Sequence, residues 1–303
     1  MYSIDLFLSE IEESQNDFLE SAILDDKLHR FGKKEHAWYI GNNDFITIGS
    51  WKFGVKKTFN LKNPNMPISN ESKIKSSESA IQQGNENFRF ETKEKSIWFF
   101  EKGNNEQSLY LSKKKITSNF GAKTKDNGAT LLVPIYDLDG FHSLQIIKED
   151  STKLFLKHTH KKSSFYILNT KESDFLQKIK EAKILLLTEG FATGCSIQMA
   201  FPNQLIACSF DCGNIIHVVD SFLKVNPKLI IILCGDRDFK SKAGEKAIIE
   251  TNNKYPKNTI MLLPSFKAED TKLSDYNDLH CRYGIERVRD QISMGLLKYM
   301  IFL

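Results

Sequence analysis

Three carboxylate residues lie where two strongly apolar segments end. Glu189 follows the run 184–188, and Asp236 and Asp238 follow the run 229–233. Clustered carboxylates repel one another unless a cation offsets their charge, and carboxylate oxygens completed by substrate phosphates suit Mg²⁺ or Mn²⁺. Such a centre supports metal-dependent phosphoryl transfer. We therefore take these three acids as the candidate catalytic and metal-binding residues.

The elements around these acids alternate between strand and helix. Continuous apolar runs of strand length occupy 184–188, 205–208, 229–233 and 260–263, and helical patterns occupy 191–201, 215–223 and 242–254. This alternation predicts an α/β domain with a parallel four-stranded sheet flanked by helices on both faces. Ligands of such sheets bind outside the carboxyl ends of the strands, so the fold is expected to bring the three acids together.

Three short motifs occur in order in this region: TEGFATG at 188–194, FDCGN at 210–214 and SDYNDLH at 274–280. Together they resemble the Toprim domain of bacterial primases, topoisomerases and related nucleases. The closer likeness is to the Toprim primases of plasmids and phages, the conjugative plasmid primase-like family. It extends over about 28–280 and implies a divalent-metal-dependent DNA primase, a nucleotidyltransferase that makes short primers on single-stranded DNA.

Further site residues follow from the motifs and from their place after the strands. Asp278 returns to the same edge of the sheet and is expected to help hold a second metal ion. The remaining motif residues are expected to support the centre: Gly190, Asp211, Asn214, Asp275, Asn277 and His280.

The segment 238–244 lies between a metal-binding strand end and the start of a helix. Backbone amides and the helix dipole favour anions at such a place. We expect Lys240, Lys242 and Gly244 to receive nucleotide phosphates, although both lysines also fit a solvated turn.

The chain ahead of this domain divides into three segments. Residues 1–60 predict an amphipathic helix over 4–24 and a small antiparallel sheet, and 61–95 has the composition of a linker. Residues 96–180 predict a β-rich module with a hairpin of 129–136 and 144–147, in which Asp137 and Asp139 form the turn. Residues 181–303 form the Toprim catalytic domain in this division.

Two groups of lysines are candidates for nucleic-acid binding. Lys52, Lys56 and Lys57 lie beside Trp51 and Phe53, an arrangement that suits backbone contacts with base stacking, although the aromatic residues also suit a small core. The second group is Lys157, Lys161 and Lys162, in a basic loop with His158 and His160 that is expected to face the catalytic centre. The lysine run 113–115 is either a solvated turn or a further phosphate contact.

Composition is ordinary for a soluble protein. The 303 residues are 41% hydrophobic and 26% charged, with a net charge of +4, and this permits an anionic partner. No apolar stretch reaches the roughly 18 residues of a membrane span, so we expect a cytoplasmic protein with no membrane contact. The five cysteines are expected to be reduced.

Three classes of function are compatible with these features. A primase would use single-stranded DNA and nucleoside triphosphates, and the missing Walker motif would leave unwinding to a separate replicative helicase. A Toprim-type metal-dependent nuclease could use the same carboxylates. A nucleic-acid-binding accessory protein of a mobile element is the third class. A topoisomerase is disfavoured, because 303 residues leave no room for its gate domains.

Overall fold

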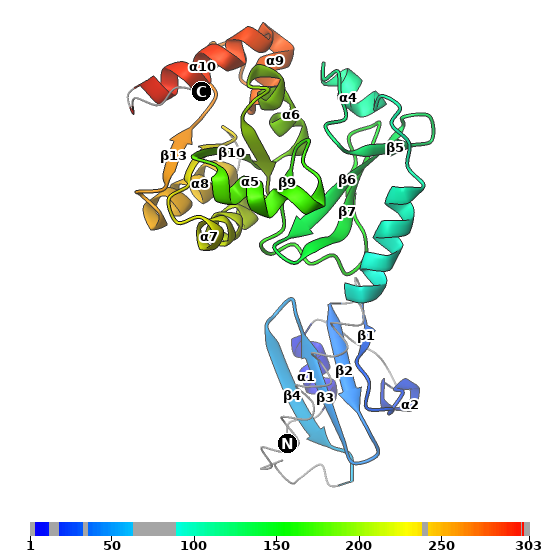
Figure 1. The fold of residues 1–303 in the computed structure, drawn as a ribbon. Coiled ribbons are helices and arrows are strands. Elements are labelled where there is room, and N and C mark those ends of the chain that lie inside the picture. The colour runs from blue at the N-terminus through cyan, green and yellow to red at the C-terminus, as the bar shows by residue number, and fades with distance from the viewer. Residues whose placement is uncertain are drawn as a thin grey trace. The chain divides into compact units, whose positions relative to one another are not determined.

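The computed structural model describes residues 4–11, 18–32, 36–62, 89–237, 242–297 and 299. They fall into two compact units, Met1–Phe90 and Glu91–Leu303 (Figure 1). Two predicted site residues, Asp238 and Lys240, lie outside the described residues, as does most of the predicted linker. The four-segment division with boundaries at 60, 95 and 180 stays a prediction.

The first unit contains the predicted small antiparallel sheet. Its four strands pair in chain order as successive hairpins. Trp38 and Phe45 are 4% and 8% exposed, so these two aromatic residues are buried in the core of the unit. The strands are β1 (His29–Phe31), β2 (Ala37–Gly41), β3 (Phe45–Ser50) and β4 (Val55–Asn60).

The prediction of one helix over 4–24 is wrong. The chain instead forms α1 (Ile4–Glu10) and α2 (Phe18–Ser21), and residues 22–24 are not helical. The backbone N–H of Ile23 donates to the hydroxyl of Tyr39 at 3.0 Å, which directs the chain to the sheet instead of into another helical turn. Apolar residues of both helices join the sheet in one core: Phe7, Leu8, Ile11, Phe18, Phe31, Ala37, Tyr39, Ile46 and Ile48.

The second unit begins with helical residues 91–101 and continues into a four-stranded antiparallel sheet. The predicted hairpin is confirmed, with Asp137 accepting the N–H of Asp139 at 2.8 Å and Gly140 at a φ of +115°. Glycine suits this position because it has no Cβ to clash there. The strands are β5 (Lys123–Lys125), β6 (Thr130–Asp137), β7 (Gly140–Lys148) and β8 (Lys153–Phe155).

The predicted parallel sheet is confirmed and has one additional strand. The order is β13-β12-β10-β11-β9, in which β9 is antiparallel to β11 and the other neighbours are parallel. The added strand carries Tyr166, which is fully buried and donates from its hydroxyl to the carbonyl of Phe120 at 2.7 Å. The strands are β9 (Tyr166–Ile167), β10 (Ile184–Thr188), β11 (Leu205–Cys208), β12 (Ile230–Cys234) and β13 (Thr259–Leu262).

Helices cover both faces of this sheet (Figure 1). Successive strand residues point to opposite faces, so Leu186 and Ile232 join one core while Leu185 and Ile231 join the other. Burial on both sides explains why these strands are continuously apolar. The helices are α5 (Phe175–Glu181), α6 (Phe191–Ala200), α7 (Ile215–Val225), α8 (Ala243–Lys254), α9 (Tyr276–Tyr283) and α10 (Ile285–Leu297).

No helix in the described part of the chain is both long enough and apolar enough to cross a membrane.

Candidate active site at the carboxyl ends of the parallel strands

Glu189 and Gly190 form the turn between β10 and α6. The hydroxyl of Thr188 donates to the carbonyl of Gly190 at 3.1 Å, which closes this turn. The backbone N–H of Phe210 donates to the carbonyl of Glu189 at 2.9 Å. The turn is therefore held from the end of the neighbouring strand β11, and the Glu189 side chain is placed at the edge of the sheet.

Asp236 lies just beyond β12 and meets Glu189 at this edge. A Cβ atom on Gly244, in the first turn of α8, would lie 3.6 Å from the Cβ of Asp236 and 3.8 Å from Oε2 of Glu189. One helical turn thus adjoins both carboxylates. The Oδ1 atom of Asp236 is buried and has no hydrogen-bond partner among the described residues. A buried carboxylate oxygen without a hydrogen-bond donor is well suited to bind a cation.

Asp275 is the third carboxylate that lines the small cavity at this edge of the sheet, beside Glu189 and Asp236. It caps the start of α9, where Oδ1 accepts the N–H of Asp278 at 2.7 Å and Oδ2 accepts the hydroxyl of Thr193 at 3.1 Å. The backbone of Arg237 donates to the carbonyl of Ser274 at 2.7 Å, which joins this loop to the end of β12. Asp275, predicted only to support the centre, lies inside it.

Asp278 faces a different partner. Its Oδ2 accepts the backbone N–H of Ser274 at 2.8 Å, and it does not line the cavity. Its charge still reaches the centre, because it contributes to the raised pKa of Asp236. The role of Asp278 in holding a second metal ion stays a prediction.

The electrostatics of the centre favour a bound cation. Burial, followed by the charges of Asp275 and Glu189, raises the pKa of Asp236 to about 8. Burial and the neighbouring Asp278 also raise the pKa of Asp275. The ionised carboxylates therefore repel one another in this buried place, and a bound divalent cation would offset that repulsion. The described residues contain no group of three metal-binding side chains, and the predicted ligand Asp238 lies outside them.

A basic and polar wall faces these acids. The cavity of about 100 Å³ is lined on this side by Lys114, Lys153, Gln145 and Tyr110, from the antiparallel sheet and the segment before it. Sequence reasoning considered Lys114 only as one of two alternatives, and it noted Tyr110 only as part of the segment 109–116, which resembles a segment of the same family. It missed Gln145 and Lys153, which no motif marks, because they reach the acids only through the packing of the antiparallel sheet on the parallel sheet.

A second hollow, of about 580 Å³, opens at the amino ends of β10 and β11. It is larger than the acidic cavity but contains none of the predicted site residues. Because the carboxylates converge in the smaller cavity, we place the chemistry there.

Asn277 and His280 form a buried network behind the centre. The Asn277 side-chain amide donates to the carbonyl of Lys114 at 2.9 Å and to the hydroxyl of Ser196 at 2.9 Å. That hydroxyl also hydrogen-bonds Nδ1 of His280 at 3.1 Å. The two predicted supporting residues therefore fix the backbone from which Lys114 extends.

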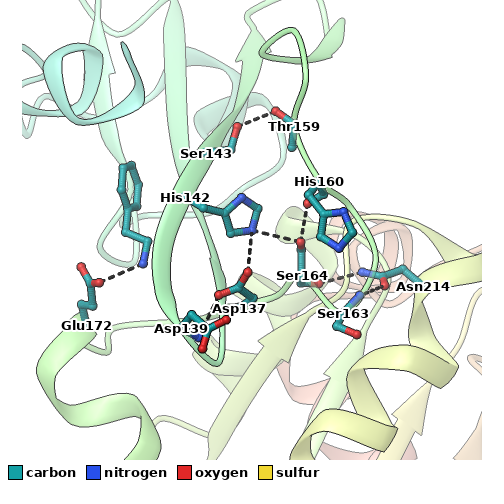
Figure 2. Close-up of polar contacts among 11 residues, drawn as sticks. Asp137, Asp139, His142, Ser143, Thr159, His160, Ser163, Ser164, Glu172 and Asn214 are labelled. Carbon is teal, nitrogen blue, oxygen red and sulfur yellow. Dashed lines mark hydrogen bonds and ion pairs between the residues drawn. The ribbon is translucent and has the colours of Figure 1, made fainter. Parts of the chain in front are cut away.

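Asn214 joins the basic loop to the end of β11. It accepts from the N–H of Ser163 at 2.8 Å and donates to the carbonyl of Ser164 at 2.7 Å (Figure 2). From β7, His142 contacts the hydroxyl of Ser164 at 3.1 Å, as Figure 2 also shows. Asp211 accepts the N–H of Gly213 at 2.9 Å in the same turn. Asn214 and Asp211 thus hold the geometry of these loops, and their supporting roles in the centre stay predictions.

Four lysines that were predicted to bind DNA or nucleotide phosphates do not line the cavity. The basic-loop lysines 157, 161 and 162 do not line it, and the Lys161 ammonium lies 4.2 Å from the Phe155 ring centroid. Lys242 precedes α8 with a left-handed φ of 52° and is exposed. The roles of these lysines in binding stay predictions.

The predicted lysines of the first unit accompany an aromatic cluster. The guanidinium of Arg30 lies 4.4 Å from the Trp51 ring centroid, and the ring of Trp51 lies 5.6 Å from that of Trp38. Strand pairing places Arg30, Trp38 and Lys56 in one cross-strand row. Lys57, one residue on, points to the opposite face of β4.

Comparison with known proteins gives matches in the same region. Residues 184–286 match a family model described as a Toprim domain. Two curated proteins, both DNA primase TraC of Escherichia coli, are 29% identical over 134 and 130 residues, 44% and 43% of this chain. The matched parts are 12% and 9% of those proteins, so this chain spans only a small part of their length.

Two solved structures are also similar. The primase fragment of the bacteriophage T7 primase-helicase protein is 16% identical with a TM-score of 0.49, over 64% of this chain and 77% of that one. A DnaG primase catalytic domain bound to single-stranded DNA is 14% identical with a TM-score of 0.46, over 72% and 83% of the two chains.

Proposed function

We propose that this chain, which carries a Toprim domain at residues 184–286, is a DNA primase that synthesises short primers on single-stranded DNA. The observation that supports this most is the convergence of Glu189, Asp236 and Asp275 with two lysines in one small cavity. Nucleotidyl transfer needs this combination, because a triphosphate and a divalent cation must be held together. The sequence similarity to DNA primase TraC supports the same assignment.

The residues have separate roles in this proposal. Glu189 and Asp236, with Asp238, hold Mg²⁺ or Mn²⁺, and Asp278 helps hold a second ion. The ion, when bound, neutralises phosphate charge and orients the reacting oxygens. Gly244 allows the first turn of α8 to approach both acids, and Lys240 and Lys242 contact nucleotide phosphates at that helix end.

The partners follow from the same reading. The template is single-stranded DNA, the substrates are nucleoside triphosphates, and a separate replicative helicase unwinds the duplex in the cytoplasm. Lys157, Lys161 and Lys162 contact the template in the second unit, and Lys52, Lys56 and Lys57 contact it in the first. These contacts are electrostatic, so binding should weaken steeply with salt.

Incubation with single-stranded DNA, Mg²⁺ and labelled nucleoside triphosphates tests the proposal. We expect labelled short oligonucleotides and little cleavage of the DNA. Cleavage of labelled DNA without nucleotide incorporation, in Mg²⁺ and in Mn²⁺, would identify a Toprim nuclease. Binding of DNA with neither reaction would identify an accessory protein.

Changes in the aromatic cluster of the first unit should weaken DNA binding. Trp51 is 40% exposed and Lys56 lies on its side of the sheet, so one can stack a base while the other contacts phosphate. We expect Trp51→Ala to cost about 1–3 kcal/mol of binding free energy. Lys56→Ala should reduce the slope of log affinity against log salt by about 0.7.

Fluorescence anisotropy with labelled oligo(dT) at several salt concentrations measures both effects. Lys62→Ala is the matched control, because Lys62 is an exposed lysine of the same unit that pairs with Asp44 at 2.5 Å. Equal affinities for all three variants and the wild type would remove this surface from the proposed template path.

A further inference from the structure

A hollow opens on the parallel sheet at the edge opposite the acidic cavity. We call it the amino-end hollow, because it lies where β10 and β11 begin. Its volume is about 580 Å³, within the range of roughly 300–1,000 Å³ that small-molecule sites occupy. No residue of its lining also lines the acidic cavity, so a ligand bound here would be remote from the carboxylates.

Part of the lining is apolar and continuous with the core. Leu168, Ile184 and Leu205 contribute to it. Leu168 is 3% exposed, and Ile184 packs against the same core cluster. A flat apolar ring could cover this surface and remove it from water, which an inorganic ion could not do.

Gln198, near the end of α6, places a free amide oxygen in the hollow. The residue is only 4% exposed, and its side-chain NH₂ group donates to the carbonyls of Phe201 and Pro202 at 3.1 and 3.0 Å. Its amide oxygen accepts no hydrogen bond from the described residues. This oxygen is not enclosed by the protein, so it reaches the open space of the hollow. It is therefore available to a donor such as an exocyclic amino group.

Three further side-chain amides line the hollow, those of Asn169, Asn203 and Gln204. Their side chains form no hydrogen bond with any residue that the structure describes. Each amide presents a donor and an acceptor side by side, and Asn and Gln pair in this way with N6 and N7 of adenine. Free amides beside an apolar surface therefore suit an adenine base.

Two lysines make the rim of the hollow positive. The ammonium of Lys178 donates to the hydroxyl of Thr170 at 3.1 Å, and Lys183 pairs with no carboxylate of the described residues. Glu181, the one acid of the lining, accepts a hydrogen bond from the amide of Gln177. The rim thus has more positive than negative charge, which suits a ligand with a phosphate group.

The helix ends at the hollow do not prevent this. Both α5 and α6 end here, and the carboxyl end of a helix disfavours an anion. The carbonyls at the end of α5 are taken up by Asn226, whose amide donates to Ile179 at 3.0 Å and to Ala182 at 2.9 Å. The amide of Gln198 does the same for the carbonyls that follow α6. These hydrogen bonds offset the negative helix ends.

We propose that the amino-end hollow is a second binding site, for a free adenine nucleotide. The base covers the apolar surface and donates from its amino group to the amide oxygen of Gln198, while the phosphate lies toward Lys178 and Lys183. Binding needs no metal ion, because no carboxylate of the acidic cavity takes part in it. The site is independent of primer synthesis and goes beyond the proposed function.

Calorimetric titration with adenosine monophosphate (AMP) in a chelator tests this inference, because the metal-free acidic cavity repels phosphate. We expect AMP to bind more tightly than inosine monophosphate, in which a carbonyl replaces the amino group, and more tightly than adenosine, which has no phosphate. Lys183→Ala should weaken AMP binding by about 3- to 10-fold and leave adenosine binding unchanged. The double variant Asn203→Ala with Gln204→Ala should weaken the binding of both by about 3- to 10-fold.

Two variants are controls for the place of binding. Lys180→Ala removes an exposed lysine of α5 that does not line the hollow, and Glu189→Gln changes the acidic cavity. Both should bind AMP as the wild type does. Lys183 and Asn203 are exposed and Gln204 is half-buried, so their replacement should leave the fold intact, which circular dichroism verifies.

The outcomes separate this site from the proposed function. No AMP binding by the wild type, or equal AMP affinity in Lys183→Ala and the wild type, would overturn the second site. Loss of AMP binding in Glu189→Gln would overturn it as well, by placing the nucleotide in the acidic cavity. A wild type that makes no primers but binds AMP with the expected losses would keep the second site and overturn only the primase proposal.

Discussion

Replacing Glu189 with glutamine will reduce nucleotide incorporation by about 1,000-fold or more. The substitution keeps the shape of the side chain but removes the negative charge at the point where β10, α8 and β8 meet. A bound metal ion would then lack its carboxylate ligand at the Glu-Gly turn. The backbone contacts of Glu189 with Phe210 do not involve its side chain, so the fold should be retained.

Incorporation of labelled nucleotide on single-stranded DNA measures this effect, with circular dichroism to verify folding. Glu250→Gln is the matched control, since Glu250 is an exposed residue of α8 that pairs with Lys246 at 3.8 Å. It should keep full activity. Retention of more than about a tenth of wild-type activity by Glu189→Gln would exclude Glu189 from the chemistry.

The second large effect concerns stability without metal. The pKa of Asp236 rises from 3.8 to about 8 on folding, chiefly through burial. Between these values the folded protein binds a proton that the unfolded chain lacks, so the free energy of unfolding falls as the pH rises. Asparagine carries no such charge. Asp236→Asn should therefore stabilise the metal-free protein by roughly 2–5 kcal/mol at pH 8 and by little near pH 4.

Urea unfolding in a chelator, across this pH range, measures the difference. Mg²⁺ should then stabilise the wild type more than Asp236→Asn, because only the wild type has the full carboxylate set. Asp290→Asn, an exposed change on α10, should follow the wild type at every pH. If the difference in unfolding free energy between Asp236→Asn and the wild type does not grow with pH, Asp236 stays ionised in the metal-free protein.

The centre of the parallel sheet could be predicted because its signals are local. The apolar runs before Glu189 and Asp236 mark buried strands, and the glycine after Glu189 marks the turn. The rule that parallel strands bind ligands at their carboxyl ends then joins acids that are distant in sequence. The Toprim resemblance, confirmed by the match over residues 184–286, depends on the same residues.

The rest of the site could not be predicted because it depends on tertiary packing. Lys153 has no motif, and only the pairing of β8 with β7 and the contact of Phe155 with Phe210 bring it to Glu189. The sequence predicts Asp278 as a metal ligand and Asp275 as a supporting residue, but the first turn of α9 directs Asp278 toward the backbone of Ser274 while Asp275 lines the cavity. The predicted helix over 4–24 does not reach Leu24, because the backbone N–H of Ile23 donates to the hydroxyl of Tyr39 just after α2.

Template-directed synthesis is the most direct test of the central claim. Wild type and Glu189→Gln are incubated in Mg²⁺ with oligo(dT) or oligo(dC) and each labelled nucleoside triphosphate, and the end-labelled template is followed in parallel. We predict that the wild type makes short labelled oligonucleotides only from the nucleotide complementary to the template, that Glu189→Gln makes none, and that the template stays intact. Template cleavage that is lost in Glu189→Gln, without any complementary incorporation by the wild type, would contradict the account.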